Sequence, residues 1–318
     1  MLEGALTRRT AERLIETAIA APSLHNSQPW RFIARLADRV IEIYADPART
    51  LRRGDPRGRA VHIACGSALF NLRLAIGQAG CEPVARLLPS RRDPLLLASV
   101  RLAGPYRPRP AERDLYAAIR RPTGRRPFTG HSLPRGLLLA LREAAMLEGA
   151  SLRQFDRADV LPGISGSRIQ APGKRATGGV LAMRDFFPGP DGYPVPPAAF
   201  EAGAQLVVIS TSADDRASWL RAGQAAQRVL LLGAHRGLVA APVSLVPEVP
   251  GGPAHGEPAF DGEHPAMILR LSRGQQWPVA TRRSVAEVLR VISPASVPQA
   301  AGGGQHMPTT QPVTVSGR

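Results

Sequence analysis

The sequence has few cysteines, few aromatic residues and almost no lysine. Cys65 and Cys81 are the only cysteines among 318 residues, too few for a disulfide framework or a cysteine-rich zinc cluster. There is no run of about 18 uncharged apolar residues, so we expect no transmembrane helix. The N-terminus lacks a cationic segment followed by an apolar one, which argues against a signal peptide. These absences predict a cytoplasmic protein without a membrane anchor.

Basic residues greatly outnumber acidic ones. Lysine and arginine total 41 against 25 acidic residues, a formal net charge of +16, and such an excess is typical of nucleic-acid-binding proteins. However, Lys174 is the only lysine, and the arginines are dispersed, in pairs at most. A GC-rich coding sequence would produce this bias together with the 31 glycines and 31 prolines. We ascribe most of the charge to composition, while individual arginines remain candidates for binding an anion.

The apolar pattern predicts two sets of helices and strands, each with one long helix near its centre. In the first set we expect helices over 10–21 and 58–79 and strands over 30–36, 39–45, 84–88 and 96–103. In the second we expect helices over 111–119, 134–147 and 218–236, strands over 151–156, 205–211 and 266–272, and a short helix after Ser284. This predicts an α+β fold with related domains over 1–107 and 108–293, joined near a Pro-rich boundary at 104–110.

Two further segments lack a long periodic pattern. Residues 160–200 are rich in glycine and proline, so we expect a lid there. Residues 294–318 are rich in small and polar residues, so we expect a disordered tail.

The densest polar segment is Pro22–Trp30, between a helix end and a strand start, where backbone groups lack helical partners. Two prolines stiffen it, and Gln28 is predicted to be extended because a proline follows it. The side chains of Ser23, Asn26 and Gln28 offer donors and acceptors that suit the edge of a heteroaromatic ring. The alternative is a helix-capping turn, and for Trp30 alone we expect a place in the core.

A second candidate segment is basic. In an extended chain, Arg121, Thr123 and Arg125 would point to the same side. Two guanidinium groups and a hydroxyl group make a good phosphate clamp. The alternative, a solvated basic linker, stays open on this segment alone.

Two weaker features lie further along the chain. Gly237 ends a predicted helix, and a glycine permits close approach to a flat ligand, although it is also an ordinary helix cap. Arg282 precedes the short C-terminal helix, where it is either another phosphate contact or part of a surface pair with Arg283.

Taken together, these segments resemble the nitroreductase family of FMN flavoproteins. Pro22–Trp30 matches the family signature Pro-Ser-x-x-Asn-x-Gln-Pro-Trp at every fixed position. The basic segment is similar to the family's Arg-x-Ser-x-Arg phosphate motif, with threonine in place of serine. Gly237-Leu238 resembles a Gly-Leu-Gly turn in which Val239 replaces the second glycine, and Arg282 resembles a C-terminal phosphate contact. Ala280 falls where many members have a lysine.

The order of the motifs resembles the Acg-like branch of the family, in which one chain carries two nitroreductase-like halves. The resemblance implies two α+β sandwich domains of the FMN-dependent nitroreductase fold, which mimic the family homodimer. It implies one intact FMN site, with the mirror site lacking both an arginine clamp and the polar loop. The implied cofactor-binding residues are Pro22, Ser23, Leu24, Asn26, Gln28, Arg121, Thr123, Arg125, Gly237, Leu238 and Arg282.

The resemblance also implies a reaction, in which hydride passes from NAD(P)H through FMN to a nitroaromatic or quinone-like small molecule. The chemistry then belongs to the flavin, so we name no catalytic residue of the protein. The seven histidines show no metal-ligand spacing, so we name no metal site. The alternatives are an FMN-binding storage or stress protein with little turnover and, more remotely, a basic nucleic-acid-binding protein. A monomer built as an internal pseudo-dimer and a homo-oligomer both remain open.

Overall fold

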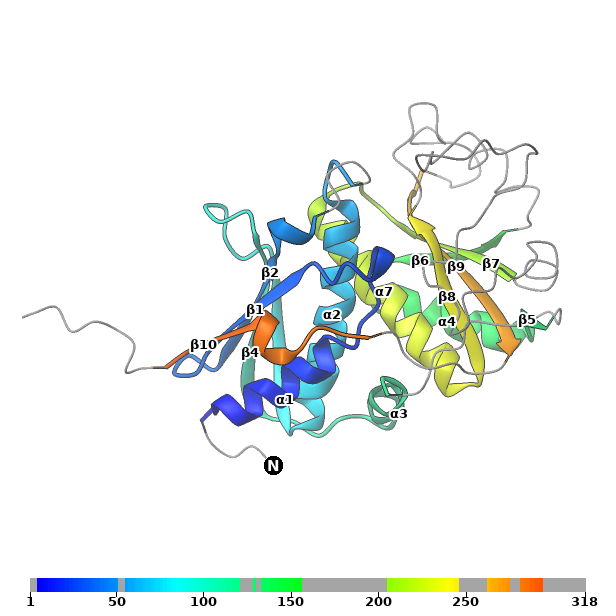
Figure 1. Cartoon of the computed structure of the whole chain (residues 1–318). Coiled ribbons are helices and arrows are strands. Elements are labelled where there is room, and N and C mark those ends of the chain that lie inside the picture. The colour runs from blue at the N-terminus through cyan, green and yellow to red at the C-terminus, as the bar shows by residue number, and fades with distance from the viewer. Residues whose placement is uncertain are drawn as a thin grey trace, which may run out of the picture.

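Two five-stranded sheets flank a pair of long helices in the computed structural model of the chain (Figure 1). The structure describes residues 5–50, 55–120, 128–129, 133–155, 205–245, 262–274 and 281–293. The helices are α1 (Arg8–Ala18), α2 (Arg59–Gln78), α3 (Pro110–Ala118), α4 (Arg135–Met146), α7 (Arg216–His235) and α8 (Val285–Val288), with short 3-10 helices η1 (Leu24–Asn26) and η2 (Pro47–Arg49). The two predicted sets of elements therefore form two sheets.

The first sheet has the strand order β10-β1-β2-β4-β3. Its strands are β1 (Trp30–Arg35), β2 (Val40–Ala45), β3 (Cys81–Leu87), β4 (Leu96–Pro105) and β10 (Leu289–Ile292). All neighbours are antiparallel except β10, which pairs with β1 in parallel.

The second sheet has the order β5-β9-β7-β6, with β8 also paired to β9. Its strands are β5 (Phe128–Thr129), β6 (Ser151–Phe155), β7 (Gln205–Thr211), β8 (Leu238–Leu245) and β9 (His264–Gly274). All of its pairings are antiparallel.

The two sheets repeat one topology. The path β1-β2-β4-β3 of the first sheet corresponds to β6-β7-β9-β8 of the second, and the long helix follows the second strand of each path. A shorter helix, α1 or α4, precedes the first strand of each path. The weak sequence repeat thus has a clear structural form, because the strand order repeats where residue identity does not.

Helices α2 and α7 cross at two glycines. A Cβ atom on Gly66 would collide with the backbone oxygen of Leu220, and a Cβ atom on Gly223 would collide with that of Ile63. Each glycine therefore meets the carbonyl three residues before the other glycine, so the crossing is reciprocal. Leu220 belongs to the core of the first half and Ile63 to that of the second. Because the two helix backbones touch at these glycines, each helix can place a side chain in the core of the other half.

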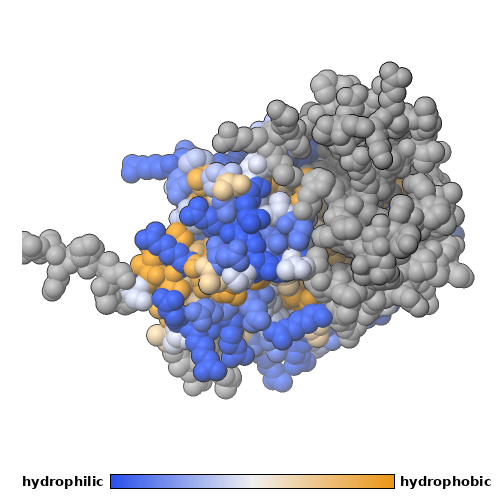
Figure 2. Space-filling view, viewed as in Figure 1, coloured by the Kyte–Doolittle hydropathy of each residue, from blue (hydrophilic) through white to orange (hydrophobic). Residues whose placement is uncertain are grey.

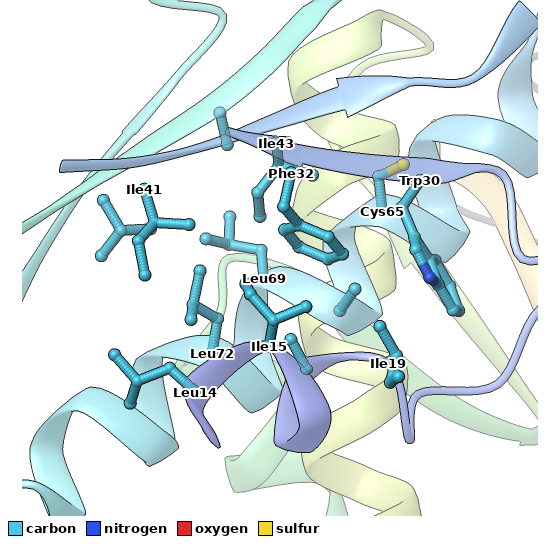
Figure 3. Packing of buried hydrophobic residues seen from close by; sticks show 14 of the residues in the cluster. Leu14, Ile15, Ile19, Trp30, Phe32, Ile41, Ile43, Cys65, Leu69 and Leu72 are labelled. Carbon is cyan, nitrogen blue, oxygen red and sulfur yellow. The ribbon is translucent and has the colours of Figure 1, made fainter. Parts of the chain in front are cut away.

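Helix α2 is long and apolar enough to cross a membrane, but 94% of its apolar stretch is buried inside the protein. A helix that is apolar all round is the pattern of a core helix. Figure 3 shows Cys65, Leu69 and Leu72 of this helix packed among Trp30, Phe32 and other side chains of the first core. Burial within the protein therefore accounts for the composition of α2.

The last described segment, residues 281–293, crosses back onto the first sheet. We call residues 281–292 the C-terminal arm. Its strand β10 pairs with β1, and Val288 of α8 is 3% exposed in the first core. The sequence assigned these residues to the second domain, and the structure shows them completing the sheet of the first half. On the visible described surface, hydrophilic residues predominate, and apolar ones gather where β10 lies (Figure 2).

Most predicted elements lie within a few residues of the observed ones, and β7 has the predicted bounds. Strands β8 and β10 were not predicted. The expected lid at 160–200 and the expected tail at 294–318 lie outside the described residues.

Candidate functional site

Three of the four expected site segments are described by the structure. These are the polar loop Pro22–Trp30, the Gly237-Leu238 turn and Arg282. Arg121, Thr123 and Arg125 lie outside the described residues, so their role stays a prediction.

The described segments converge at one apolar cluster. Ile119 and Ala234 belong to this cluster, and the partly buried Ala20 packs against it. Ala20, Ile119 and Ala234 lie just before the polar loop, the arginine segment and the glycine turn, respectively. Arg282 reaches the same place, because its Nη2 donates a hydrogen bond to the backbone oxygen of Ala20 at 3.1 Å. The fold therefore brings the starts of three distant segments together with Arg282 near the C-terminal end of α7.

The polar loop is a tight turn closed by its own side chains. The backbone N–H of Gln28 donates to Ser23 Oγ at 2.9 Å. Asn26 and Gln28 both have left-handed backbones, with φ of 55° and 48°. The prediction of an extended Gln28 was wrong, since the bond to Ser23 turns the backbone back on itself before Pro29. Trp30, which follows, is fully buried in the first core as predicted.

Side-chain amides of this loop contact the C-terminal arm. Asn26 Nδ2 donates to the backbone oxygen of Thr281 at 3.0 Å. Gln28 Oε1 accepts from the backbone N–H of Arg283 at 2.7 Å, and Gln28 is 5% exposed. Both side-chain amides that were expected to face a ligand therefore bond to the C-terminal arm.

The neighbouring arginines of the arm have different surroundings. Arg282 Nη1 donates to Asn26 Oδ1 at 3.3 Å, and its Nη2 donates to the backbone oxygen of Ala20. Burial lowers the pKa of Arg282 below its usual value, and a nearby anion would offset that desolvation. Arg283 instead forms an interior ion pair with Asp46, at 3.4 Å between Nη1 and Oδ2. Sequence reasoning considered both arginines but missed Asp46, for which the only local signal was its place at a strand end.

The glycine turn leaves space beside its backbone. Gly237 has φ of 76°, in the left-handed region, and a Cβ atom built there would meet nothing within 4 Å. Leu238, by contrast, is 3% exposed and packs in the core of the second half. Any contact that this turn makes with a ligand therefore involves backbone atoms.

Comparison with known proteins supports the resemblance in sequence. No protein-family model matches the chain. A Mycobacterium tuberculosis protein named "Putative NAD(P)H nitroreductase" is 27% identical over 315 residues, covering 88% of this chain and 91% of the relative. A second, named "Putative NAD(P)H nitroreductase acg", is 37% identical over 100 residues, 31% of this chain and 30% of the relative.

The fold has a counterpart among solved structures. The crystal structure of a "putative nitroreductase" from Anabaena variabilis matches with a TM-score of 0.52 at 12% identity, over 84% of this chain and 88% of that chain. The chain is similar in sequence to nitroreductases over most of its length, which supports the predicted resemblance to the nitroreductase family. The overlap with acg supports its Acg-like branch, and the predicted α+β nitroreductase fold is confirmed.

In the described part of the second half, the connection equivalent to the polar loop is much shorter. A short turn over residues 147–150 joins α4 directly to β6. Its Glu148 side chain is 4% exposed and binds Arg73 Nη1 at 2.6 Å and Arg228 Nη2 at 2.7 Å. Since Arg73 belongs to α2 and Arg228 to α7, an ion-pair network between the halves lies next to this turn.

Proposed function

We propose that this protein is an oxidoreductase that binds FMN and passes hydride from NAD(P)H to a nitroaromatic or quinone-like small molecule. The observation that carries the proposal is the convergence of the polar loop, the Gly237 turn and Arg282 near the end of α7. The name of the full-length relative, an NAD(P)H nitroreductase, supports the oxidoreductase class and the nicotinamide donor.

The described residues fit a flavin mononucleotide. The desolvated guanidinium group of Arg282 suits a phosphate. The open, left-handed backbone at Gly237 suits close approach of a flat ring. The loop offers amide and carbonyl groups, and Asn26 Nδ2 has a second N–H besides the one given to Thr281. These are the donor and acceptor types that the edge of a flavin ring requires.

Each predicted site residue then has a task. Backbone groups of Pro22, Ser23 and Leu24 would hold the ring edge, together with the second amide N–H of Asn26. Gln28 acts indirectly, because it is almost fully buried and holds the arm. Leu238 acts through its backbone, since its side chain is in the core.

Arg282 would hold the phosphate together with Arg121, Thr123 and Arg125. When bound, FMN supplies the hydride chemistry, so the chain binds, orients and shields the reactants and needs no acid or base of its own. The protein works in the cytoplasm, where Cys65 and Cys81, which form no disulfide, stay reduced. It works as a monomer if the internal pair of halves replaces the family dimer, and the alternative is a homo-oligomer.

The first test is the absorbance spectrum of the purified protein, with its flavin-to-protein ratio. We expect a yellow protein that releases FMN on denaturation and oxidises NAD(P)H when a nitroaromatic or quinone is added. A yellow protein inactive over a broad panel of acceptors would support the storage alternative. A colourless protein whose nucleic-acid binding weakens steeply with salt would overturn the proposal.

A further inference from the structure

We propose that the C-terminal arm is a clasp that sets the conformation of the polar loop, with Arg283 as its positioning residue. The clasp is a contact within the protein, and only its effect on flavin affinity rests on the proposed function.

The arm is held at two points, one on the polar loop itself and one on the first sheet. Downstream, β10 pairs with β1 through Phe32–Leu289 to Arg35–Ile292, and Val288 is buried in the first core. Upstream, the backbone oxygen of Thr281 accepts from Asn26 Nδ2 at 3.0 Å. The stretch between these anchors is thereby held against the polar loop.

Arg283 makes the central contacts of this stretch. Its backbone N–H donates to Gln28 Oε1 at 2.7 Å, and its Nη1 donates to the backbone oxygen of Gln28 at 3.3 Å. The guanidinium group also binds Asp46 Oδ2 at 3.4 Å and the backbone oxygen of Glu287 at 3.1 Å. One side chain therefore joins the loop, the end of β2 and α8.

The backbone of the loop explains why such a clasp is needed. Asn26 and Gln28 have left-handed φ values of 55° and 48°, and a left-handed residue other than glycine is unfavourable by about 1–2 kcal/mol. Asparagine tolerates this region better than glutamine does. Within the loop, the Ser23 hydroxyl stabilises the turn, and the arm adds bonds to both left-handed residues. The Arg283 side chain adds a bond to the backbone oxygen of Gln28 and fixes the arm through Asp46 and Glu287, so without this side chain we expect the loop to relax.

The two neighbouring arginines thus differ in how they affect a flavin. Arg282 contacts Asn26 and suits the phosphate, whereas Arg283 is 12% exposed and points into the protein. Loss of Arg282 should weaken binding of FMN but not of riboflavin, which has no phosphate. Loss of Arg283 should weaken both equally, because it disturbs the loop at the ring edge.

The test compares Arg283→Ala with the wild type and with Arg290→Ala as the matched control. Arg290 is an exposed arginine of the same arm, on β10. Hydrogen exchange is measured peptide by peptide, and Kd values for FMN and riboflavin are measured by flavin fluorescence. For Arg283→Ala we expect faster exchange in residues 22–28 but not in α2, and both Kd values to rise about tenfold or more. Arg290→Ala should behave like the wild type.

Unchanged exchange of residues 22–28 in Arg283→Ala would overturn the clasp. So would a loss of affinity for FMN with none for riboflavin, which would make Arg283 a phosphate ligand. If Arg283→Ala does not fold, Asp46→Asn removes the ion pair while keeping an oxygen for the backbone of Ala48, and it must show the same local exchange. If the wild type binds neither flavin while the variant loosens the loop, the clasp stands and the FMN proposal falls.

Discussion

The two halves of the chain pass from helix to strand in different ways. In the first half, residues 19–29 join α1 to β1 and include most of the polar loop, which the C-terminal arm contacts by hydrogen bonds. In the second half, the short turn 147–150 links α4 to β6, and the buried Glu148 holds it through two arginines. Both halves keep the same strand order and the same glycine crossing. Packing of the core thus constrains the repeat, while the helix-to-strand connection outside the core differs: it is the proposed binding loop in one half and lies beside an ion-pair network in the other.

The strongest way to break both halves at once is Gly223→Ala. Its new Cβ atom would collide with backbone atoms of Ile63, and helix backbones cannot yield as side chains do. We expect a loss of about 3 kcal/mol or more in the free energy of unfolding, measured by chemical denaturation. The control is Gly233→Ala on the same helix, where the Cβ atom would lie in ordinary contact with Leu238. A variant at Gly223 as stable as this control would show that the crossing is looser than described.

Glu148→Ala should break the second turn alone. It leaves the partly buried guanidinium groups of Arg73 and Arg228 without their shared carboxylate. We expect a loss of about 2–4 kcal/mol in the free energy of unfolding. After refolding in saturating FMN, the flavin content of the variant should equal that of the wild type, because the polar loop is untouched. The control, exposed Glu143→Ala, should change stability by about 0.5 kcal/mol or less. A loss of flavin in Glu148→Ala without a loss of stability would contradict a purely structural second turn.

The double variant Arg121→Ala/Arg125→Ala should weaken the proposed site of the first turn without changing the fold. Removing two charged phosphate donors is expected to raise the Kd for FMN about tenfold or more. Flavin content and fluorescence titration measure the effect. The control is Arg91→Ala/Arg92→Ala, which removes the same number of positive charges at two exposed positions of the first half. Unchanged flavin content in the first double variant would remove the phosphate role of this segment.

The smallest expected effect concerns His62 and Trp219, which lie four residues before the two crossing glycines. Their rings contact edge to face, with centroids 5.5 Å apart. Burial lowers the pKa of His62 below its ordinary 6.5, and nearby Arg216 lowers it further. Arg216 Nε donates to His62 Nε2 at 2.9 Å, so the folded state favours the neutral ring.

Because the folded protein binds this proton less readily, the stability due to His62 is present above pH 6.5 and is lost as the pH falls through the folded value. The slope is at most about 1.4 kcal/mol per pH unit. Unfolding measured from pH 7.5 to 5 should show a smaller decline for His62→Gln than for the wild type. Equal declines would assign the pH dependence to other groups.

Local sequence patterns predicted the elements whose packing is local. The apolar stripe of α2 and the buried run of β7 were sufficient to place both. Strand β8 was missed because Gly237 and Pro242 are typical of turns, although Pro242 sits at a register shift in the pairing with β9. Strand β10 was missed because it forms only against β1, from the other end of the chain.

The site, too, could be predicted only where its residues are close together in the sequence. The polar loop was identifiable because its residue types are contiguous, and Arg282 was named from the resemblance. The tasks of the two arginines depend on partners such as Asn26, Gln28 and Asp46, from which they are separated by most of the chain. A left-handed Gln28 was also unpredictable, because it depends on Ser23 and on the arm together.

The pairing of β10 with β1 has a consequence for biosynthesis. Chains are made from the N-terminus, and early segments fold while later ones are still being synthesised. The polar loop is made before the second half of the chain, and the residues of the arm that contact it are made after the strands of the second sheet. The first sheet therefore lacks its edge strand until β10 has been made, and the proposed clasp can form only after that point.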